Sequence, residues 1–127
     1  MCLIDRVLSY DNRTIRCTSN SHLDKNNPLR RGDRLSSING IEYAAQVMAV
    51  HSSLVENIEP GQIGYLGALR NIEINQPWLD SRQEVLVVEA RLIGSSFAGA
   101  IYQFSVEADS GTIISGRATI MTGSGKQ

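Results

Sequence analysis

Three side chains near the middle of the sequence have the chemistry of catalytic acids and bases: His22, Glu42 and His51. Glu42 opens an apolar stretch, from Gly40 to about Leu54, that predicts a helix. His51 lies nine positions after Glu42, which at about 100° per residue turns the two side chains to opposite sides of that helix. A Glu42–His51 pair is therefore excluded, and we expect His51 to be packed or hydrogen-bonded within the fold.

Glu42 itself has two interpretations. With Asn39 as the N-cap, it forms a variant of the capping box, and the positive end of the helix favours a carboxylate there. Alternatively, apolar surroundings keep it protonated for acid catalysis, with His22 from the preceding polar segment as its partner. A single loop histidine is otherwise typical of solvated surface. The residues alone leave both interpretations of Glu42 open.

The elements that must position these residues follow from the hydrophobic pattern. Residues 2–8 and 14–19 flank a turn and predict a hairpin. The polar residues 20–40 predict a long loop, and loops of that length are usually functional or disordered. The later alternation predicts four strands: residues 64–74, 84–94, 99–109 and 112–121. Gly67 in the first predicts a bulge or a close backbone approach, and the last three are expected in consecutive antiparallel order.

The helix and the strands together predict one α+β domain over residues 1–127. The helix leaves no broad polar stripe, so most of its sides must be buried. An antiparallel sheet with one buried face needs a cover, and this helix is the cover available. We therefore expect a sheet curled around a central helix. The start MCLIDRV enters a strand at once, as in a chain truncated at its N-terminus, and we expect the tail 122–127 to be frayed.

Composition narrows the class of function. Twelve basic against 13 acidic residues argue against a nucleic-acid partner, which favours a basic excess. The sequence shows no apolar run of about 20 residues and no signal peptide, so we expect no membrane segment and a cytoplasmic location. Cys2 and Cys17 lack the spacing of a metal or redox motif and are expected to be buried thiols. Trp78 is expected to pack a loop against the sheet.

Four segments, taken in order, carry a resemblance to a known family: LIDRVL, HLDKNNP, GIEYAAQ and GYLGALRNIEI. Together they resemble the hot-dog-fold 3-hydroxyacyl-[acyl-carrier-protein] dehydratases, and most of all the divergent branch associated with aryl-polyene biosynthesis. The similarity runs over nearly the whole chain. It implies a hot-dog fold, an antiparallel sheet wrapped around one long helix. It also implies a dimer, with itself or with a paralogue, that extends the sheet and places each site at the interface.

The resemblance also implies site residues. His22 and Glu42 match the family's catalytic histidine and helix acid, which come from different subunits, and Gln46 stands at the glutamine four positions after the acid. The usual His-Phe-Pro-Gly loop is replaced by a longer segment. In it, a backbone N–H of Ser37 or a neighbour takes the place of the glycine N–H that polarises the thioester carbonyl. N–H groups at the helix start, Gly40, are a further source.

The expected reaction is therefore dehydration of a 3-hydroxyacyl thioester on an acyl carrier protein to the trans-2-enoyl thioester, with His22 as base and Glu42 as acid. No cofactor is expected, because the substrate is attached to the 4'-phosphopantetheine of the carrier protein. Arg30, Arg31 and Arg34 are candidate contacts to its phosphate or to the carrier's acidic surface, with a solvated basic loop as an equal alternative. Two rivals stay open: an acyl-thioester hydrolase, and a non-catalytic acyl-binding or heterodimer partner subunit.

Overall fold

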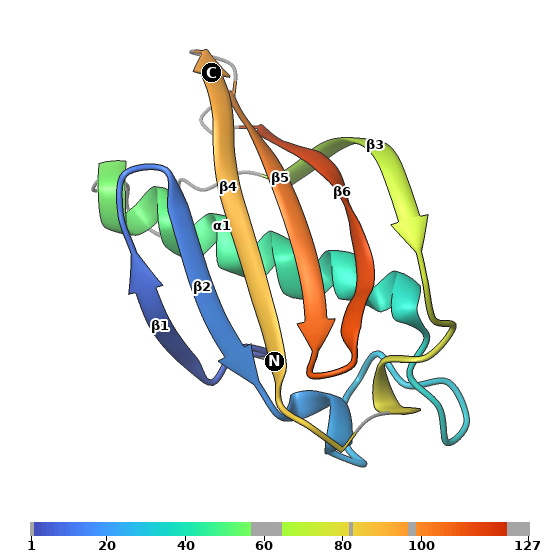
Figure 1. The fold of residues 1–127 in the computed structure, drawn as a ribbon. Helices are drawn as coiled ribbons and strands as arrows, with labels where there is room; N and C mark the ends of the chain where they lie inside the picture. The colour runs from blue at the N-terminus through green and yellow to red at the C-terminus, as the bar shows by residue number, and fades with distance from the viewer. Residues whose placement is uncertain (1, 57–64, 82, 97–98, 122–127) are drawn as a thin grey trace.

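One long helix lies across a six-stranded antiparallel sheet in the computed structural model (Figure 1). The structure describes residues 2–56, 65–81, 83–96 and 99–121. In chain order the elements are β1 (Arg6–Tyr10), β2 (Thr14–Ser19), the 3-10 helices η1 (Ser21–Leu23) and η2 (Ser37–Asn39), α1 (Gly40–Glu56), β3 (Tyr65–Ile74), the 3-10 helix η4 (Leu79–Ser81), β4 (Leu86–Ser96), β5 (Gly99–Ala108) and β6 (Gly111–Met121).

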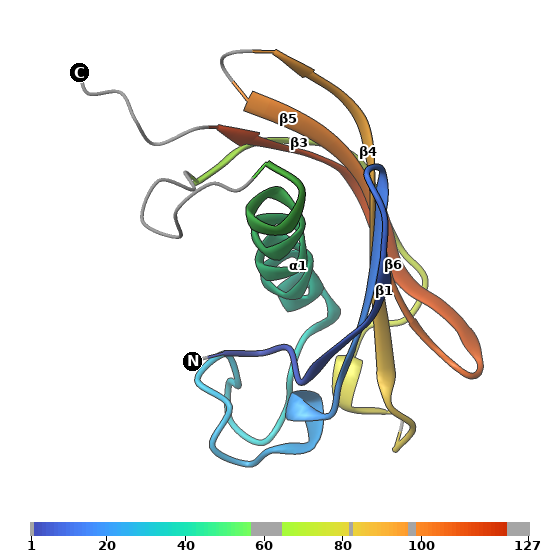
Figure 2. The same ribbon diagram turned by 90° about the vertical axis from the view of Figure 1, so that its left-hand side faces the viewer.

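The strand order in the sheet is β1-β2-β4-β5-β6-β3, so β1 and β3 form its two edges. The last three strands are neighbours in consecutive antiparallel order, as the sequence predicts, with Val88 opposite Val106 and Phe104 opposite Gly116. Figure 2 shows the sheet curving around α1, which packs against β2, β4, β5 and β6. The expected sheet curled around a central helix is therefore confirmed.

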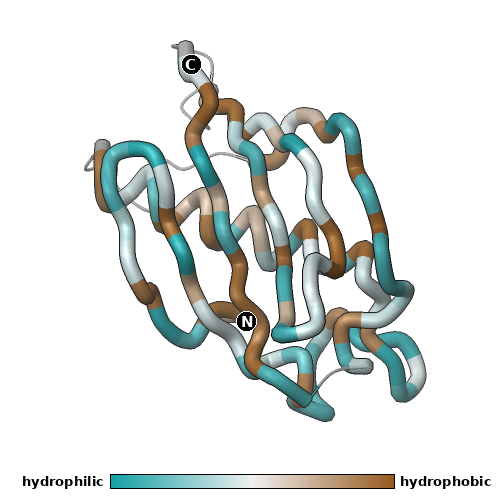
Figure 3. Tube along the Cα trace, viewed as in Figure 1, coloured by the Kyte–Doolittle hydropathy of each residue, from teal (hydrophilic) through white to brown (hydrophobic). Residues whose placement is uncertain are grey.

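The core lies between the helix and the concave face of the sheet. Burial alternates from residue to residue along β2 and along most of β5, so that alternate side chains of these strands point inward. Figure 3 shows apolar and polar residues interspersed along the strands. Each buried large apolar side chain contributes about 1.5–3 kcal/mol relative to exposure. The fully buried side chains include Tyr43, Val47, Met48, Leu86, Val88, Tyr102, Phe104 and Val106. No helix within the described ranges is long and apolar enough to cross a membrane.

The N-terminal hairpin differs in part from its prediction. The turn lies where expected, and its N–H groups at Arg13 and Thr14 hold the pKa of the Asp11 carboxyl below its usual value. However, β1 begins at Arg6 rather than at residue 2. Leu3 explains the difference, because its N–H donates to Gln46 Oε1 (2.7 Å) and its carbonyl accepts from the Ser21 hydroxyl (2.9 Å). These side chains take bonds that a strand ladder would use.

The edge strand β3 bends twice against β6. The predicted bulge at Gly67 is confirmed by a register shift between Leu66 and Ala68. A second shift, which the sequence analysis missed, surrounds Asn71, whose φ of 56° lies in the left-handed region. This second bend sets Ile72 over Gly116, where an added Cβ would lie 2.4 Å from Ile72 Cδ1 and 3.2 Å from the Arg70 carbonyl oxygen. The edge therefore depends on a glycine in the neighbouring strand.

Gly116→Ala should lower the free energy of unfolding by about 1–3 kcal/mol, because a methyl group there overpacks the contact between β3 and β6. Gly94→Ala is the matched control, since nothing lies within 4 Å of the Cβ that it would add. Urea denaturation of both variants measures the difference. Equal stability of the two variants would contradict this account of the β3 bend.

The two cysteines have different surroundings. Cys17 is buried on the inner face of β2, as expected, and burial raises the pKa of its thiol to about 11. Cys2 is exposed, so the expectation that both thiols are buried is wrong for this one. It precedes the first strand, at a position that strand packing does not enclose. Both thiols are free.

A thiol reagent at neutral pH should therefore modify one cysteine rapidly in the native protein and the second only after denaturation. The Cys17 thiol, with a pKa of about 11, holds little thiolate at neutral pH and is shielded as well. Cys2→Ser should abolish the rapid phase. Rapid modification of two thiols per native chain would contradict the burial of Cys17.

Candidate functional site

The segment between β2 and α1, predicted as a loop, is ordered by pairing with the segment before β4. Ser36 forms an isolated antiparallel bridge with Trp78. Beside it, the Leu79 N–H donates to the Leu35 carbonyl (2.9 Å). The segment also contains η1, which carries His22, and η2, which leads directly into α1. Residues 20–40 are therefore an ordered part of the fold, with η1 near one end and η2 at the other.

His22 lies in η1 and is fully buried. Next to it, the Ser21 hydroxyl lies 2.7 Å from the Tyr43 hydroxyl, which also accepts from Asn27 Nδ2 (3.1 Å). Because Ser21 gives its proton to the Leu3 carbonyl, the Tyr43 hydroxyl is the donor to Ser21. Burial raises the pKa of Tyr43, which therefore remains a phenol at neutral pH. This hydrogen bond ties η1 to the first turn of α1.

Tyr43 is the residue supporting the candidate site that the sequence analysis missed. A signal was present, because a tyrosine within a helix that must be buried needs a partner for its hydroxyl. The partner could not be read from the sequence, since Ser21 and Asn27 are distant along the chain. Tyr43 directly follows Glu42, and its partner Ser21 directly precedes His22. The bond between Tyr43 and Ser21 therefore holds together the two segments that carry these residues.

Glu42 lies in the first turn of α1 and is exposed in the single chain. The capping-box interpretation is wrong in its residues. Ser36 is the N-cap of η2, with its hydroxyl accepting from the Ile38 N–H (3.4 Å). The Asn39 side chain instead donates to the Leu29 carbonyl (3.5 Å). The run of η2 into α1 moves the cap upstream, so Glu42 is left facing outward from the helix.

The other residues expected to bind substrate make bonds within the chain. Gln46 holds the Leu3 N–H, as described above. The Ser37 N–H donates to the Pro77 carbonyl (2.9 Å), and its hydroxyl donates to the Gln76 carbonyl. The Gly40 N–H points back to the Ser37 and Ile38 carbonyls. An N–H that polarises a substrate carbonyl must therefore come from elsewhere, or one of these bonds must open.

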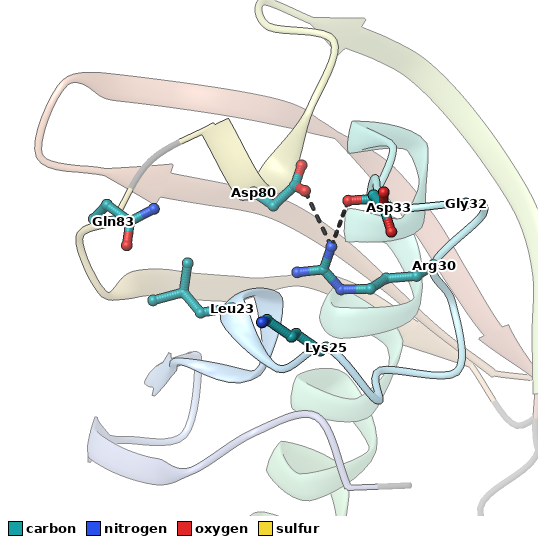
Figure 4. Close-up of a pocket in the computed structure, with 7 residues that line it drawn as sticks. All are labelled: Leu23, Lys25, Arg30, Gly32, Asp33, Asp80 and Gln83. Atoms are coloured by element: carbon teal, nitrogen blue, oxygen red, sulfur yellow. Dashed lines mark hydrogen bonds and ion pairs between the residues drawn. The ribbon is translucent and has the colours of Figure 1, made fainter.

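The three loop arginines differ in exposure and partners. Arg30 is largely buried in an ion pair with Asp80 (3.2 Å). Arg34 also reaches Asp80 (3.4 Å), and its guanidinium lies 4.2 Å from the centre of the Trp78 ring. Arg31 is exposed. Beside them is an open pocket of about 510 Å³, shown in Figure 4 and lined by Leu23, Lys25, Arg30, Gly32, Asp33, Asp80 and Gln83.

His51 has the structural role expected for it. It is fully buried, with Nε2 2.9 Å from the Asp11 carbonyl and Nδ1 2.8 Å from the Tyr102 hydroxyl. A carbonyl can only accept, so Nε2 carries the proton of the neutral ring and Nδ1 accepts from Tyr102. Ser52 lies 3.2 Å from the same hydroxyl. This network joins α1 to the β1–β2 turn and to β5.

Tyr102→Phe should lower the free energy of unfolding by about 1–3 kcal/mol, because it leaves the buried Nδ1 of His51 without this donor. Tyr10→Phe is the control, since Tyr10 is 52% exposed and should change stability by less than about 0.5 kcal/mol. Urea denaturation compares them. If the two substitutions were equally harmless, the network around His51 would not stabilise the fold.

Solved structures with similar folds fall into two groups. The dehydratase heterocomplex ApeI:P from Xenorhabdus doucetiae matches with a TM-score of 0.79 at 17% identity, covering 94% of this chain and 82% of that chain. Zebrafish thioesterase superfamily member 2 matches with a TM-score of 0.67 at 17% identity, covering 92% and 80%. A hypothetical thioesterase from Streptococcus pneumoniae, solved with coenzyme A, matches with a TM-score of 0.66 at 11% identity, covering 92% and 84%. These matches confirm the expected hot-dog fold.

Sequence comparison identifies the family. No curated protein sequence matches the chain. The family described as ApeP-like, ApeP dehydratase, matches residues 1–126, which is almost the entire sequence. The match agrees with the resemblance carried by the segments around His22 and Glu42. The chain therefore belongs to the family of ApeP-like dehydratases.

Proposed function

We propose that this dehydratase acts on a 3-hydroxyacyl thioester carried by an acyl carrier protein and forms the trans-2-enoyl thioester. The observation that supports this proposal is the hydrogen bond between Tyr43 and Ser21 (2.7 Å). It holds the turn that carries His22 against the turn that carries Glu42. Elimination of water requires a base and an acid in fixed positions. This bond fixes both segments within each chain, and in the proposed dimer the base and the acid of one site come from different chains.

In the proposed reaction His22 removes a proton from C2 of the acyl chain. The electron pair forms the C2=C3 double bond, the C3–O bond breaks, and the departing hydroxyl takes a proton from Glu42 to leave as water. An imidazole suits the first step near neutral pH, and a protonated carboxyl suits the second. The proposed acid–base steps use the protein's own side chains, with the 4'-phosphopantetheine arm belonging to the substrate.

The exposure of Glu42 supports a site completed by a partner subunit. A carboxyl acid works best in a water-poor pocket, and Glu42 is exposed in the single chain. The edge strand β3 offers a place for the partner: Leu69 is 41% exposed and Ile74 is 49% exposed, and an unpaired strand edge invites pairing. We propose a second copy of this chain as the partner, with a paralogue as the alternative that the ApeI:P heterocomplex suggests.

The carrier protein is proposed to dock beside the segment between β2 and α1. Arg31 and Arg34 are exposed there and can meet a phosphate or an acidic surface. The acyl tail would follow the apolar helix and sheet. The resemblance to the aryl-polyene branch favours an unsaturated or aryl-capped chain as the substrate. A cytoplasmic location, expected from the sequence, is part of this proposal.

Two other candidate functions can be distinguished from dehydration by the product that each would release. The thioesterase folds among the similar structures, together with an exposed helix carboxylate that can activate water, favour acyl-thioester hydrolysis as the second candidate. The heterocomplex favours a non-catalytic acyl-binding or partner subunit as the third. A hydrolase releases a thiol, a dehydratase releases an enoyl thioester, and a partner subunit releases neither by itself.

The proposal is tested by giving the purified protein 3-hydroxyacyl carrier thioesters of several chain lengths and head groups. Wild type should form enoyl product, whereas His22→Gln and Glu42→Gln should each lower kcat by about 10²–10⁴-fold, because each removes one proton-transfer group. Mass spectrometry of the carrier follows the loss of water, and a thiol reagent follows hydrolysis.

Glu89→Gln is the control, because this carboxylate pairs with Arg16 (3.7 Å) and both residues alternate with buried neighbours, which places them on the opposite face of the sheet from α1. It should leave kcat within about twofold of wild type, as expected for a solvated surface pair. Release of thiol without enoyl product would identify a hydrolase. Full activity of both His22→Gln and Glu42→Gln, or no product alone and with a paralogue, would remove the proposed catalytic roles.

A further inference from the structure

Arg30 occupies the centre of the segment that carries His22. Its guanidinium donates to three main-chain carbonyls, each at 2.8 Å: those of His22, Asp24 and Asp33. A fourth bond reaches the Asp80 carboxylate (3.2 Å). Figure 4 shows the side chain reaching between η1 and η4 toward Asp80. Four bonds use most of the five N–H donors of a guanidinium.

The charge of Arg30 is balanced inside the fold. The side chains of Arg30 and Asp80 are 13% and 9% exposed, so Arg30 would be left as a poorly solvated charge without Asp80. Asp80 also pairs with Arg34 (3.4 Å). Asp80 belongs to η4, and η4 is fixed to the rest of the fold through Leu79, which is fully buried. The ion pair therefore anchors the η1 segment to a part of the chain that cannot move independently of the core.

The bond to the His22 carbonyl gives this anchor a consequence for the site. It fixes the main chain of His22 within a single 3-10 turn, and with it the point from which the imidazole extends. Catalytic groups must be held to within about 0.5 Å of their working positions, and misplacement by about 1 Å can reduce a rate by about 10²-fold. A three-residue turn has little rigidity of its own, because it contains few internal hydrogen bonds.

We propose that Arg30 is a positioning residue for His22, with Asp80 as its anchor, and not a contact to the carrier protein. This proposal rests on the role proposed above for His22 as the base. The internal bonds of Arg30 leave at most one donor for a phosphate, whereas Arg31 and Arg34 are exposed. Lysine cannot replace it, because one ammonium group cannot reach acceptors that diverge around a planar fork.

The kinetic test compares Arg30→Lys and Asp80→Asn with Arg16→Lys. The control removes a guanidinium from the Arg16–Glu89 pair on the outer face of the sheet. Arg30→Lys should lower kcat about 10–100-fold with KM within about threefold, because it displaces His22 and leaves substrate binding in place. Asp80→Asn should act in the same direction and less strongly. Arg16→Lys should stay within about twofold.

A second readout does not depend on activity. The sequence contains two histidines, so the carbon-correlated proton NMR spectrum should contain two imidazole Cε1–H signals, and His22→Gln assigns them. Arg30→Lys and Asp80→Asn should shift or broaden the His22 signal and leave the His51 signal in place. Arg16→Lys should alter neither. Circular dichroism and the unchanged His51 signal report that each variant is folded.

The outcomes separate the two proposals. If Arg30→Lys does not fold, Asp80→Asn decides, because it keeps the side-chain size and the arginine. An unchanged His22 signal in the folded variants would overturn the positioning role, and so would a loss confined to KM, which would point to a carrier contact. If wild type makes no enoyl product, the dehydratase proposal fails, while the two imidazole signals still decide whether Arg30 positions His22.

Discussion

The hydrogen bond from the Tyr43 hydroxyl to Ser21 (2.7 Å) is the interaction on which the site depends. Its cause is the burial of α1: a helix enclosed by a curved sheet can carry a phenol only if the hydroxyl finds a partner. The turn that carries His22 supplies that partner, and Asn27 supplies a second. The packing requirement of the helix thereby holds these two segments together within each chain. In the proposed dimer each segment contributes its catalytic group to a different site.

The proposed site is divided between what the chain supplies and what a partner subunit is proposed to supply. The chain holds His22 buried, ties its turn through Arg30 to Asp80, and keeps Glu42 at the start of the helix. It leaves Glu42 exposed, together with apolar side chains on the edge strand β3. One partner seated on that edge would both cover the apolar side chains and enclose the carboxylate, so assembly and catalysis are proposed to be coupled.

Local periodicity made much of this fold predictable. The alternation in β4, β5 and β6, the apolar helix and the bulge at Gly67 are properties of neighbouring residues. The errors arose where contacts outside the local pattern determine the structure. Leu3 bonds Gln46 and so lies outside β1, and Ser36 rather than Asn39 caps the turn before α1. The bonds of Arg30 and Tyr43 also join residues distant in the sequence. The candidate catalytic residues could therefore be predicted from the sequence, whereas the residues that position them could not.

The most direct test of a site shared between two copies is complementation between two inactive variants. His22→Ala and Glu42→Ala are refolded together in equal amounts, so that about half of the dimers contain one chain of each kind, and one of the two sites in such a dimer is intact. The account predicts that the mixture regains about a quarter of the wild-type activity, although each variant alone is inactive. A mixture that forms dimers and remains inactive would contradict it.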